Sequence, residues 1–195
     1  MSYLLGIITL IIAVISYSFY FADILKGKTK PHVFTWFVWA VLNSFIFYQQ
    51  TIHDGGPGAW VTGAAALANI GIVLFALKYG ERNITRLDWL CLTMALAALL
   101  VWFVSPGGEL SVVLASLVFV VGFVPTFRKS LKDASEETAI TFALNSSKFL
   151  IALFALQTIS VTTTLYPAVL FIVNGYFAIF LVSRQLAMKH KRKRV

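Results

Sequence analysis

The sequence predicts an all-α integral membrane protein with seven transmembrane helices. Hydrophobic residues make up 59% of the 195 residues and charged residues only 12%, whereas an ordinary soluble domain has roughly 25% charged residues. The hydrophobic residues fall into seven runs, each close to the about 20 residues that a helix needs to cross a bilayer. Lysines and arginines gather at every second connection between these runs.

The seven runs follow one another with short connections. We place them at residues 3–24, 33–52, 58–79, 86–104, 109–127, 138–157 and 164–184. The first four connections contain the Gly, Pro and charged residues that typically end helices, and they read KGKTKPH, HDGGPG, YGERN and SPGGE. The last connection is rich in Ser and Thr. The first run lacks the basic leader and the clear cleavage site of a signal peptide, so we expect it to remain as the first span.

Positive charge predicts the orientation of the chain. Short cytoplasmic loops of membrane proteins carry an excess of Lys and Arg. The connections after the first, third and fifth runs carry these residues, as does the segment after the seventh, whereas the alternate connections carry none. We therefore expect the N-terminus outside and the C-terminus in the cytoplasm. The net charge of +8 then reflects membrane orientation, and we expect no binding of nucleic acid.

Two stretches of the chain match when one is shifted along the other. Asn69 pairs with Asn174 and Phe75 with Phe180, an offset of 105 residues in both cases (174 − 69 and 180 − 75). Parallel repeats of this kind occur in transporters that bind their substrate near the midplane between the repeats. The predicted organisation is two parallel three-helix bundles, 1–80 and 106–185, joined by a linker helix, 81–105, and followed by a basic cytoplasmic tail, 186–195.

Polar residues lie at the middle of several predicted spans. At a rise of about 1.5 Å per residue, Asn43, Asn69, Asn174 and Lys148 fall into one layer near the bilayer midplane. Helical spacing puts further polar or aromatic residues on the same faces. The candidate substrate-binding residues are Asn43, Asn69, Asn145, Asn174, Lys148 and Trp39. In the alternative interpretation, the asparagines only form hydrogen bonds across packed helix interfaces.

Lys148 is the most unusual of these residues. A charged side chain at the bilayer centre costs about 2.5–3.5 kcal/mol on insertion scales, so such residues usually face the bundle interior. All eight acidic residues lie at or near the ends of the runs, so no carboxylate partner is expected at its depth. Either a substrate brings the partner anion, or the lysine extends toward the cytoplasmic surface.

The order of three spans, one linker and three spans, with the N-terminus outside, resembles the SWEET and PQ-loop superfamily of solute carriers. The segment VPTFRKSLKDASEE (124–137) is similar to the turn after that family's fifth span, where a proline precedes a basic stretch and a Ser-Glu pair. The resemblance implies that Pro125 acts as a hinge for alternating access. It also implies that Asn69 and Asn174 take the positions of two asparagines at the family's sugar site.

Charged residues at the span ends predict a cytoplasmic gate. Asp23 ends the first predicted span, and Arg128 and Lys129 follow the fifth. We expect an ion pair between these ends to form when the cytoplasmic side closes. The alternative is that both helix ends are simply solvated, because exposed pairs contribute under about 1 kcal/mol.

We therefore expect a small-solute transporter with a midplane site, carrying a sugar or a small organic anion. The alternative is a non-transporting receptor or sorting protein on the same scaffold, which the family's peptide-retrieval receptors make possible. The sequence has no catalytic constellation and only one cysteine, Cys91, so we expect no enzyme activity, metal or cofactor. The expected partners are the solute, the lipid bilayer and, as an option, a second copy of the chain. The expected location is a bacterial-type inner membrane or a plasma membrane.

Overall fold

The computed structural model describes residues 1–104 and 108–192, and within these residues the secondary structure is entirely helical. Two 3-10 turns, η1 (Gly56–Ala59) and η2 (Ala134–Glu136), precede α3 and α6. The α-helices in chain order are α1 (Ser2–Leu25), α2 (Val33–Ile52), α3 (Trp60–Tyr79), α4 (Arg86–Val104), α5 (Gly108–Lys132), α6 (Ala139–Ala155) and α7 (Val161–Arg192).

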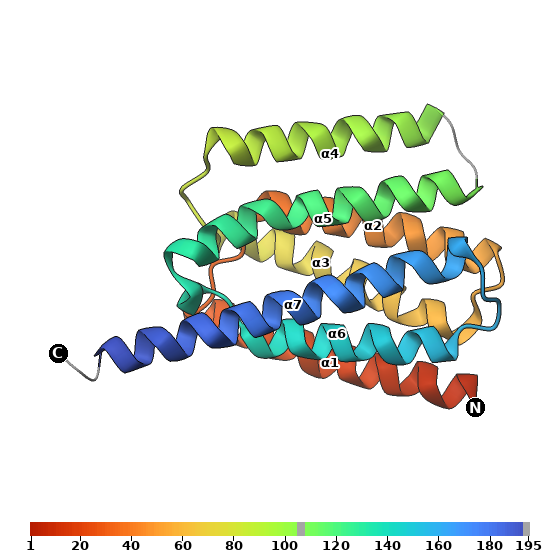
Figure 1. Ribbon diagram of the computed structural model, residues 1–195, viewed down its shortest axis with the longest axis horizontal. Helices are drawn as coiled ribbons and strands as arrows, with labels where there is room; N and C mark the ends of the chain where they lie inside the picture. Colours follow the sequence, from red (N-terminus) through yellow and green to blue (C-terminus); the bar gives the residue numbers. More distant parts are fainter. Residues whose placement is uncertain (105–107, 193–195) are drawn as a thin grey trace.

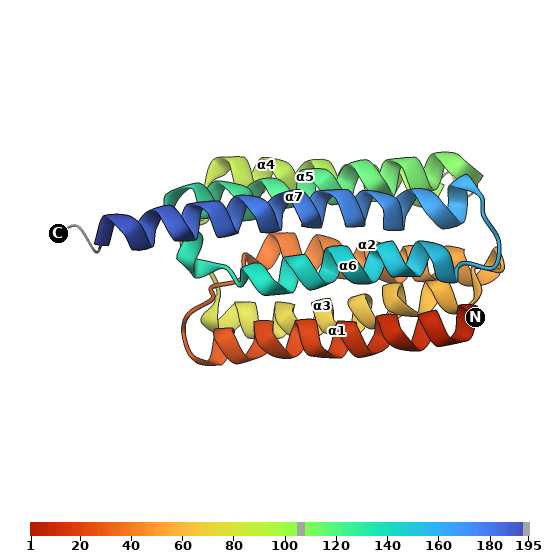
Figure 2. The ribbon, with the colours of Figure 1, turned by 60° about the horizontal axis from the view of Figure 1, so that its bottom comes forward.

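The helices lie side by side along the long axis of the molecule (Figures 1 and 2). Successive helices run in opposite directions, so the two ends of the chain lie at opposite ends of the bundle (Figure 1). We call the end that holds the α1–α2, α3–α4 and α5–α6 connections the basic end, because these connections carry the Lys and Arg residues. The opposite end, which holds the N-terminus, is called the far end.

The helices form two groups that meet along two seams. In the first group α3 packs against both α1 and α2, and in the second group α7 packs against both α5 and α6. Helix α1 meets α6 at one seam, and α2 meets α5 at the other. Helix α4 lies at the periphery, where it packs against α5 and a smaller part of α2 (Figure 1).

The composition of the helices favours a membrane protein. Four stretches are long and apolar enough, by length and composition, to cross a membrane: Ser2–Leu25, Gly56–Tyr79, Glu109–Lys132 and Val161–Met188. Helix α6 is also apolar but has only 17 residues. Large apolar side chains such as Ile11, Leu67 and Ile179 lie exposed on the outer faces of the helices, where a soluble protein would place polar residues.

Each predicted apolar run contains one helix, but the C-termini of α5 and α7 differ from the prediction by several residues and α6 differs slightly at both ends. Helix α5 continues to Lys132 rather than ending at 127, and α7 continues to Arg192 rather than 184. Both extensions are rich in Lys and Arg, which favour a helical C-terminus because they interact well with its dipole. Helix α6 is shorter than predicted, because Thr138 and Leu156 have extended backbone conformations at its two ends.

Polar residues mark the starts of two helices. The Thr85 hydroxyl accepts a hydrogen bond from the N–H of Asp88, 3.4 Å, and the Asp88 carboxylate accepts one from the N–H of Thr85, 2.7 Å. Ser160 and Thr163 form the same reciprocal arrangement before α7, at 3.3 and 3.1 Å. Such exchanges satisfy N–H groups that a helix start would otherwise leave without partners.

The charge distribution and the antiparallel order of the helices predict a sided labelling pattern. In a Cys91→Ala background, single cysteines replace His53 at the far end and Ser135 at the basic end, since both positions are exposed. A membrane-impermeant thiol reagent added outside intact cells should label the cysteine at 53 and should not reach the cysteine at 135. The opposite pattern, or labelling of both positions, would show that the expected orientation is wrong.

Candidate functional site

A closed cavity lies between the two helix groups. Every helix except α4 contributes to it, with aromatic rings and four asparagines facing one space. The lining residues are Tyr17 from α1, Trp36, Trp39 and Asn43 from α2, Ala65 and Asn69 from α3, Phe119 from α5, Asn145 and Phe149 from α6, and Leu170 and Asn174 from α7. The fold thus brings together five of the six residues that the sequence predicts as substrate-binding.

The cavity is almost filled by its own walls. The space between the lining atoms is about 250 Å³, and the centre of a water-sized sphere can occupy only about 10 Å³ of it. Holding one water molecule requires about 10–15 Å³ by that measure. The structure therefore represents a closed form, in which a solute larger than water does not fit.

Two of the asparagines have fixed amide orientations. The Asn43 Nδ2 group donates to the carbonyl of Trp39, and the Asn174 Nδ2 group donates to the carbonyl of Leu170, each at 2.8 Å. One N–H of each amide therefore donates to a backbone carbonyl on the preceding turn of its own helix. Within the described residues, the buried oxygens Oδ1 of Asn43 and Asn69 have no hydrogen-bond partner.

Aromatic residues hold the wall of the cavity between α2 and α5. The Trp39 ring stacks on Phe119 at a centroid distance of 5.1 Å, and its Nε1 donates to the Phe119 carbonyl, 3.2 Å. Trp36 packs edge-on against Trp39 at 5.0 Å. Trp36 lines the cavity, with 1% of its surface exposed.

Lys148 lies beside the cavity rather than on its surface. Its side chain is fully buried, and the ammonium nitrogen has no hydrogen-bond partner among the described residues. The nitrogen lies 4.1 Å from the ring centroid of Tyr17 and 5.3 Å from that of Phe149, and both rings line the cavity. The lysine therefore does not extend to the cytoplasmic surface, and its nearest favourable contacts are the faces of two aromatic rings.

A chain of buried hydrogen bonds closes the basic end. Trp36 Nε1 donates to the Tyr20 hydroxyl, 3.2 Å, which donates to Glu137 Oε2, 2.9 Å. The Lys129 ammonium donates to Glu137 Oε1 at 2.5 Å. We call Trp36, Tyr20, Glu137 and Lys129 the basic-end network. It joins α1 and α2 of the first group to α5 and the start of α6 in the second group.

Other hydrogen bonds strengthen the same closure. The Lys129 ammonium also donates to the carbonyls of Lys30 and Glu136. Below the cavity, Thr126 on α5 donates to the hydroxyl of Thr35 on α2, 3.0 Å. At the other seam, Ser16 on α1 donates to Asn145 Oδ1, 3.1 Å. Polar contacts therefore fasten the α2–α5 seam on the basic-end side of the cavity and the α1–α6 seam at the level of the cavity.

The expected ion pair between Asp23 and the end of α5 does not form. Asp23 instead accepts a hydrogen bond from the Thr138 hydroxyl, 2.9 Å. Arg128 makes a two-pronged contact with Asp88 on α4, at 3.0 and 2.8 Å, and Lys129 pairs with Glu137. The predicted pairing is therefore not present in this closed form, because the loop before α6 inserts Glu137 between α1 and α5.

Pro125 lies buried within α5, on the turn before Lys129. A proline has no N–H, so it cannot donate to the carbonyl of Val121 one turn earlier, and this weakens the helix at that point. The position is compatible with a bend of α5 between the cavity and the basic-end network. The hinge role of Pro125 stays a prediction.

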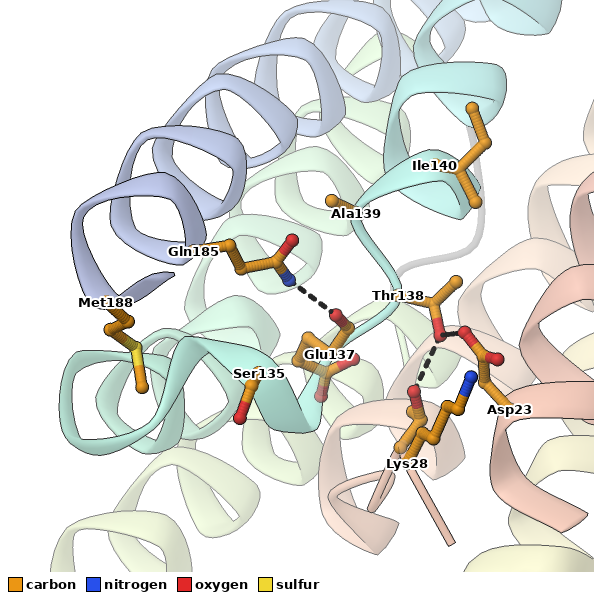
Figure 3. A pocket seen from close by; sticks show the side chains of 10 residues that line it. Asp23, Lys28, Ser135, Glu137, Thr138, Ala139, Ile140, Gln185 and Met188 are labelled. Atoms are coloured by element: carbon orange, nitrogen blue, oxygen red, sulfur yellow. Dashed lines mark hydrogen bonds between the residues drawn. The ribbon is translucent and has the colours of Figure 1, made fainter. Parts of the chain in front are cut away.

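A larger pocket lies on the basic end, outside this closure. It has a volume of about 520 Å³ and lies between the end of α1, the start of α6 and α7 (Figure 3). Asp23 and Lys28 line one side, Gln185 and Met188 line the other, and Glu137 lies at its base. Since Trp36 lines the closed cavity and Glu137 lines this pocket, the basic-end network runs from one to the other.

Burial affects the ionisable groups of this region. It raises the pKa of the Glu137 carboxyl above its ordinary value, while the Lys129 ammonium and the Tyr20 hydroxyl act in the opposite direction. Burial lowers the pKa of His32, whose Nε2 lies 3.5 Å from the Asp88 carboxylate, and that carboxylate opposes the shift. Within the described residues, no group of three or more His, Cys, Asp or Glu side chains could hold a metal ion.

The far end is closed by tight backbone packing. The η1 turn inserts between α1 and α6. A Cβ on Gly6 would lie 2.7 Å from Cβ of Pro57, and a Cβ on Gly58 would lie 2.7 Å from the backbone nitrogen of Leu156. Only glycine permits these approaches. Two hydrogen bonds add to the closure: Gln50 on α2 donates to the carbonyl of Thr163 on α7, 3.1 Å, and the N–H of Gln157 donates to the carbonyl of Gly55, 3.3 Å.

Sequence reasoning missed three functional candidates: Tyr17, Tyr20 and Glu137. A signal for the first two was present, because Ser16, Tyr17 and Tyr20 put polar atoms on one face of an otherwise apolar span. Glu137 carried no such signal, since it follows Glu136 in a charged turn where exposure is the usual outcome. Glu136 is indeed the partly exposed partner of Lys30, whereas the Glu137 side chain is fully buried.

A comparison of the chain with models of known protein families, with curated proteins and with solved structures finds no match. Functional assignment therefore depends on the chemistry of the cavity and of the two closures.

The basic-end network predicts an asymmetry between two neighbouring glutamates. Glu137→Gln removes the charged partner of buried Lys129, and breaking a buried pair in this way costs about 3–5 kcal/mol. Glu136→Gln is the matched control, because its pair with Lys30 is partly exposed and should contribute under about 1 kcal/mol. The free energy of unfolding in detergent, measured by denaturant titration, compares the two. Adding Lys129→Met to Glu137→Gln should recover part of the loss. Equal effects of the two glutamine substitutions would contradict a buried ion pair.

Proposed function

We propose that this protein is a small-solute transporter that spans the membrane seven times, with its basic end in the cytoplasm. The observation that carries the proposal is the closed cavity between the two helix groups, lined by four asparagines and five aromatic rings. Buried amide groups normally find hydrogen-bond partners inside a protein. Amide oxygens that face a cavity without partners are what a binding site for a polar solute requires.

The arrangement of the helices supports an alternating-access mechanism. The two groups, α1–α3 and α5–α7, share the same internal packing order, and they meet at two seams with the cavity between them. Both ends of the cavity are closed, the basic end by a network of buried polar side chains and the far end by close backbone packing together with hydrogen bonds. Opening one seam at a time would expose the cavity to one side of the membrane. This is how carriers built from two related bundles work.

The cavity is compatible with both substrate classes that the sequence predicts. Asparagines beside indole rings suit a sugar, because hydroxyl groups bond to amides while the apolar face of the ring packs on tryptophan. The resemblance to SWEET-type carriers points the same way, with Asn69 and Asn174 at the site. Lys148 beside the wall suits a small organic anion. The proposed location is the one expected from the sequence, a bacterial-type inner membrane or a plasma membrane.

Transport assays test this proposal. Purified protein in proteoliposomes should take up a labelled sugar or small organic anion and exchange it for unlabelled solute. Asn69→Leu and Asn174→Leu should each weaken the apparent affinity, because a lost hydrogen bond to a buried group costs about 1–3 kcal/mol, or about five- to hundredfold. Ser44→Ala is the control, since Ser44 bonds only to its own helix and does not line the cavity. Saturable binding with no uptake or exchange would instead favour the receptor.

A further inference from the structure

The free polar atoms at the cavity differ in kind between its two sides. On the side of α2 and α3, the buried oxygens of Asn43 and Asn69 have no partner within the described residues. The Asn43 amide has already used a donor on Trp39. The atoms without partners on this side are therefore hydrogen-bond acceptors, and a solute that satisfies them must bring N–H or O–H donors.

The opposite side offers an amine, which carries a positive charge when protonated. Lys148 comes from α6, in the second helix group, and its ammonium has no hydrogen-bond partner in the described part of the chain. It rests 4.1 Å from the centroid of Tyr17, a ring that lines the cavity. A lysine has four rotatable side-chain bonds, so a change of rotamer past the edge of Tyr17 would bring its charge to the cavity when the bundle loosens. A buried ammonium is costly without a counter-ion, and an anion in the cavity would supply one.

Each simpler class of solute leaves one side unsatisfied. A neutral sugar satisfies the amide oxygens but leaves Lys148 without an anion. A plain carboxylate meets Lys148 but leaves Asn43 and Asn69 without donors. An organic cation suits the amide oxygens and aromatic rings but brings no anion for Lys148.

We propose, on the basis of the transporter function above, that the substrate is a small bifunctional solute with a carboxylate at one end and N–H or O–H donors at the other. The carboxylate points toward Lys148 on α6, and the donors point toward Asn43 and Asn69 on α2 and α3. Both 2-hydroxy acids and α-amino acids have this chemistry. Because the solute bridges the two helix groups, its binding holds them together in a form that is looser at the cavity than the empty closed form.

Matched small molecules test the two ends separately. Lactate and alanine each carry a carboxylate and a donor, propionate lacks the donor, and lactamide lacks the carboxylate. The panel adds hydroxy acids and amino acids of up to six carbons, with glucose as the neutral polyol. Binding to the purified wild-type protein is measured by thermal stabilisation and isothermal titration. Some hydroxy or amino acid should bind at least tenfold more tightly than its deoxy or deamino analogue and its amide. If the hydroxy acids bind more tightly, the donor is a hydroxyl group, and if the amino acids bind more tightly, it is an ammonium group.

Variants assign each preference to a side chain. Lys148→Met should erase the preference for the acid over its amide, and Lys148→Arg should retain part of it. Asn43→Leu should erase the preference for the hydroxy or amino acid over the deoxy acid. Ser147→Ala, an exposed neighbour on α6, should change neither. Should Lys148→Met fail to fold, Lys148→Arg and Asn43→Leu still give the two selectivity ratios.

Three results would overturn the inference: no binding by any donor-bearing carboxylate, equal binding of propionate and lactate series, or glucose binding that Lys148→Met leaves intact. Because binding is measured in detergent, this outcome is separate from transport. The expected binding pattern without uptake in proteoliposomes would contradict the transporter but not the bifunctional ligand. Uptake of glucose alone would contradict the ligand but not the transporter.

Discussion

Buried polar groups need partners, and this requirement is most severe in a bundle whose outer surface faces lipid, because no water is available there to replace a missing contact. The structure meets it unevenly. At the basic end, Glu137, Lys129 and Tyr20 satisfy one another across the two helix groups. At the cavity, the oxygens of Asn43 and Asn69 and the ammonium of Lys148 have no partner within the described residues. The satisfied network holds the groups together, and the unsatisfied atoms at the cavity are the ones that the proposed solute would bind.

The two closures differ in what it takes to open them. The basic end is held by charged and hydrogen-bonded side chains, so opening it hydrates the buried pair, which offsets part of the lost contacts. The far end is held by glycine and proline backbone packed against α1 and α6, and by hydrogen bonds from Gln50 to the Thr163 carbonyl and from Gln157 N–H to the Gly55 carbonyl. Opening it breaks these hydrogen bonds but leaves the buried pair of Lys129 and Glu137 in place. A solute that binds both helix groups would act on both closures at once, because each depends on the same two seams. This links the chemistry of the cavity to movement of the bundle.

Much of this arrangement could be predicted from local sequence. The apolar runs gave the helices, and depth along each run put Asn43, Asn69 and Asn174 in one layer, where the structure places them. Trp39 and Asn145 followed from helical spacing alone. These predictions succeed because position along a helix fixes both depth and face, so residues in one layer on inward faces must meet. The helix ends were less accurate, since charged residues continue α5 and α7 beyond the apolar runs.

Pairings between side chains could not be predicted in this way. Asp23 and Lys129 lie at matching helix ends, yet each bonds to a residue of the 137–138 loop, and only the path of that loop decides which. Lys148 was assigned to the correct layer but not to its position behind Tyr17, which depends on how α1 packs on α6.

The most direct test of the central claim uses Ala65, a small cavity residue, changed to cysteine in a Cys91→Ala background. Its reaction with an impermeant thiol reagent is measured in sealed vesicles of each orientation. The account predicts slow reaction from both sides, with Glu137→Gln raising the rate several-fold from the basic end and lowering it from the far end. No reaction from either side, or rates that Glu137→Gln leaves unchanged, would contradict it.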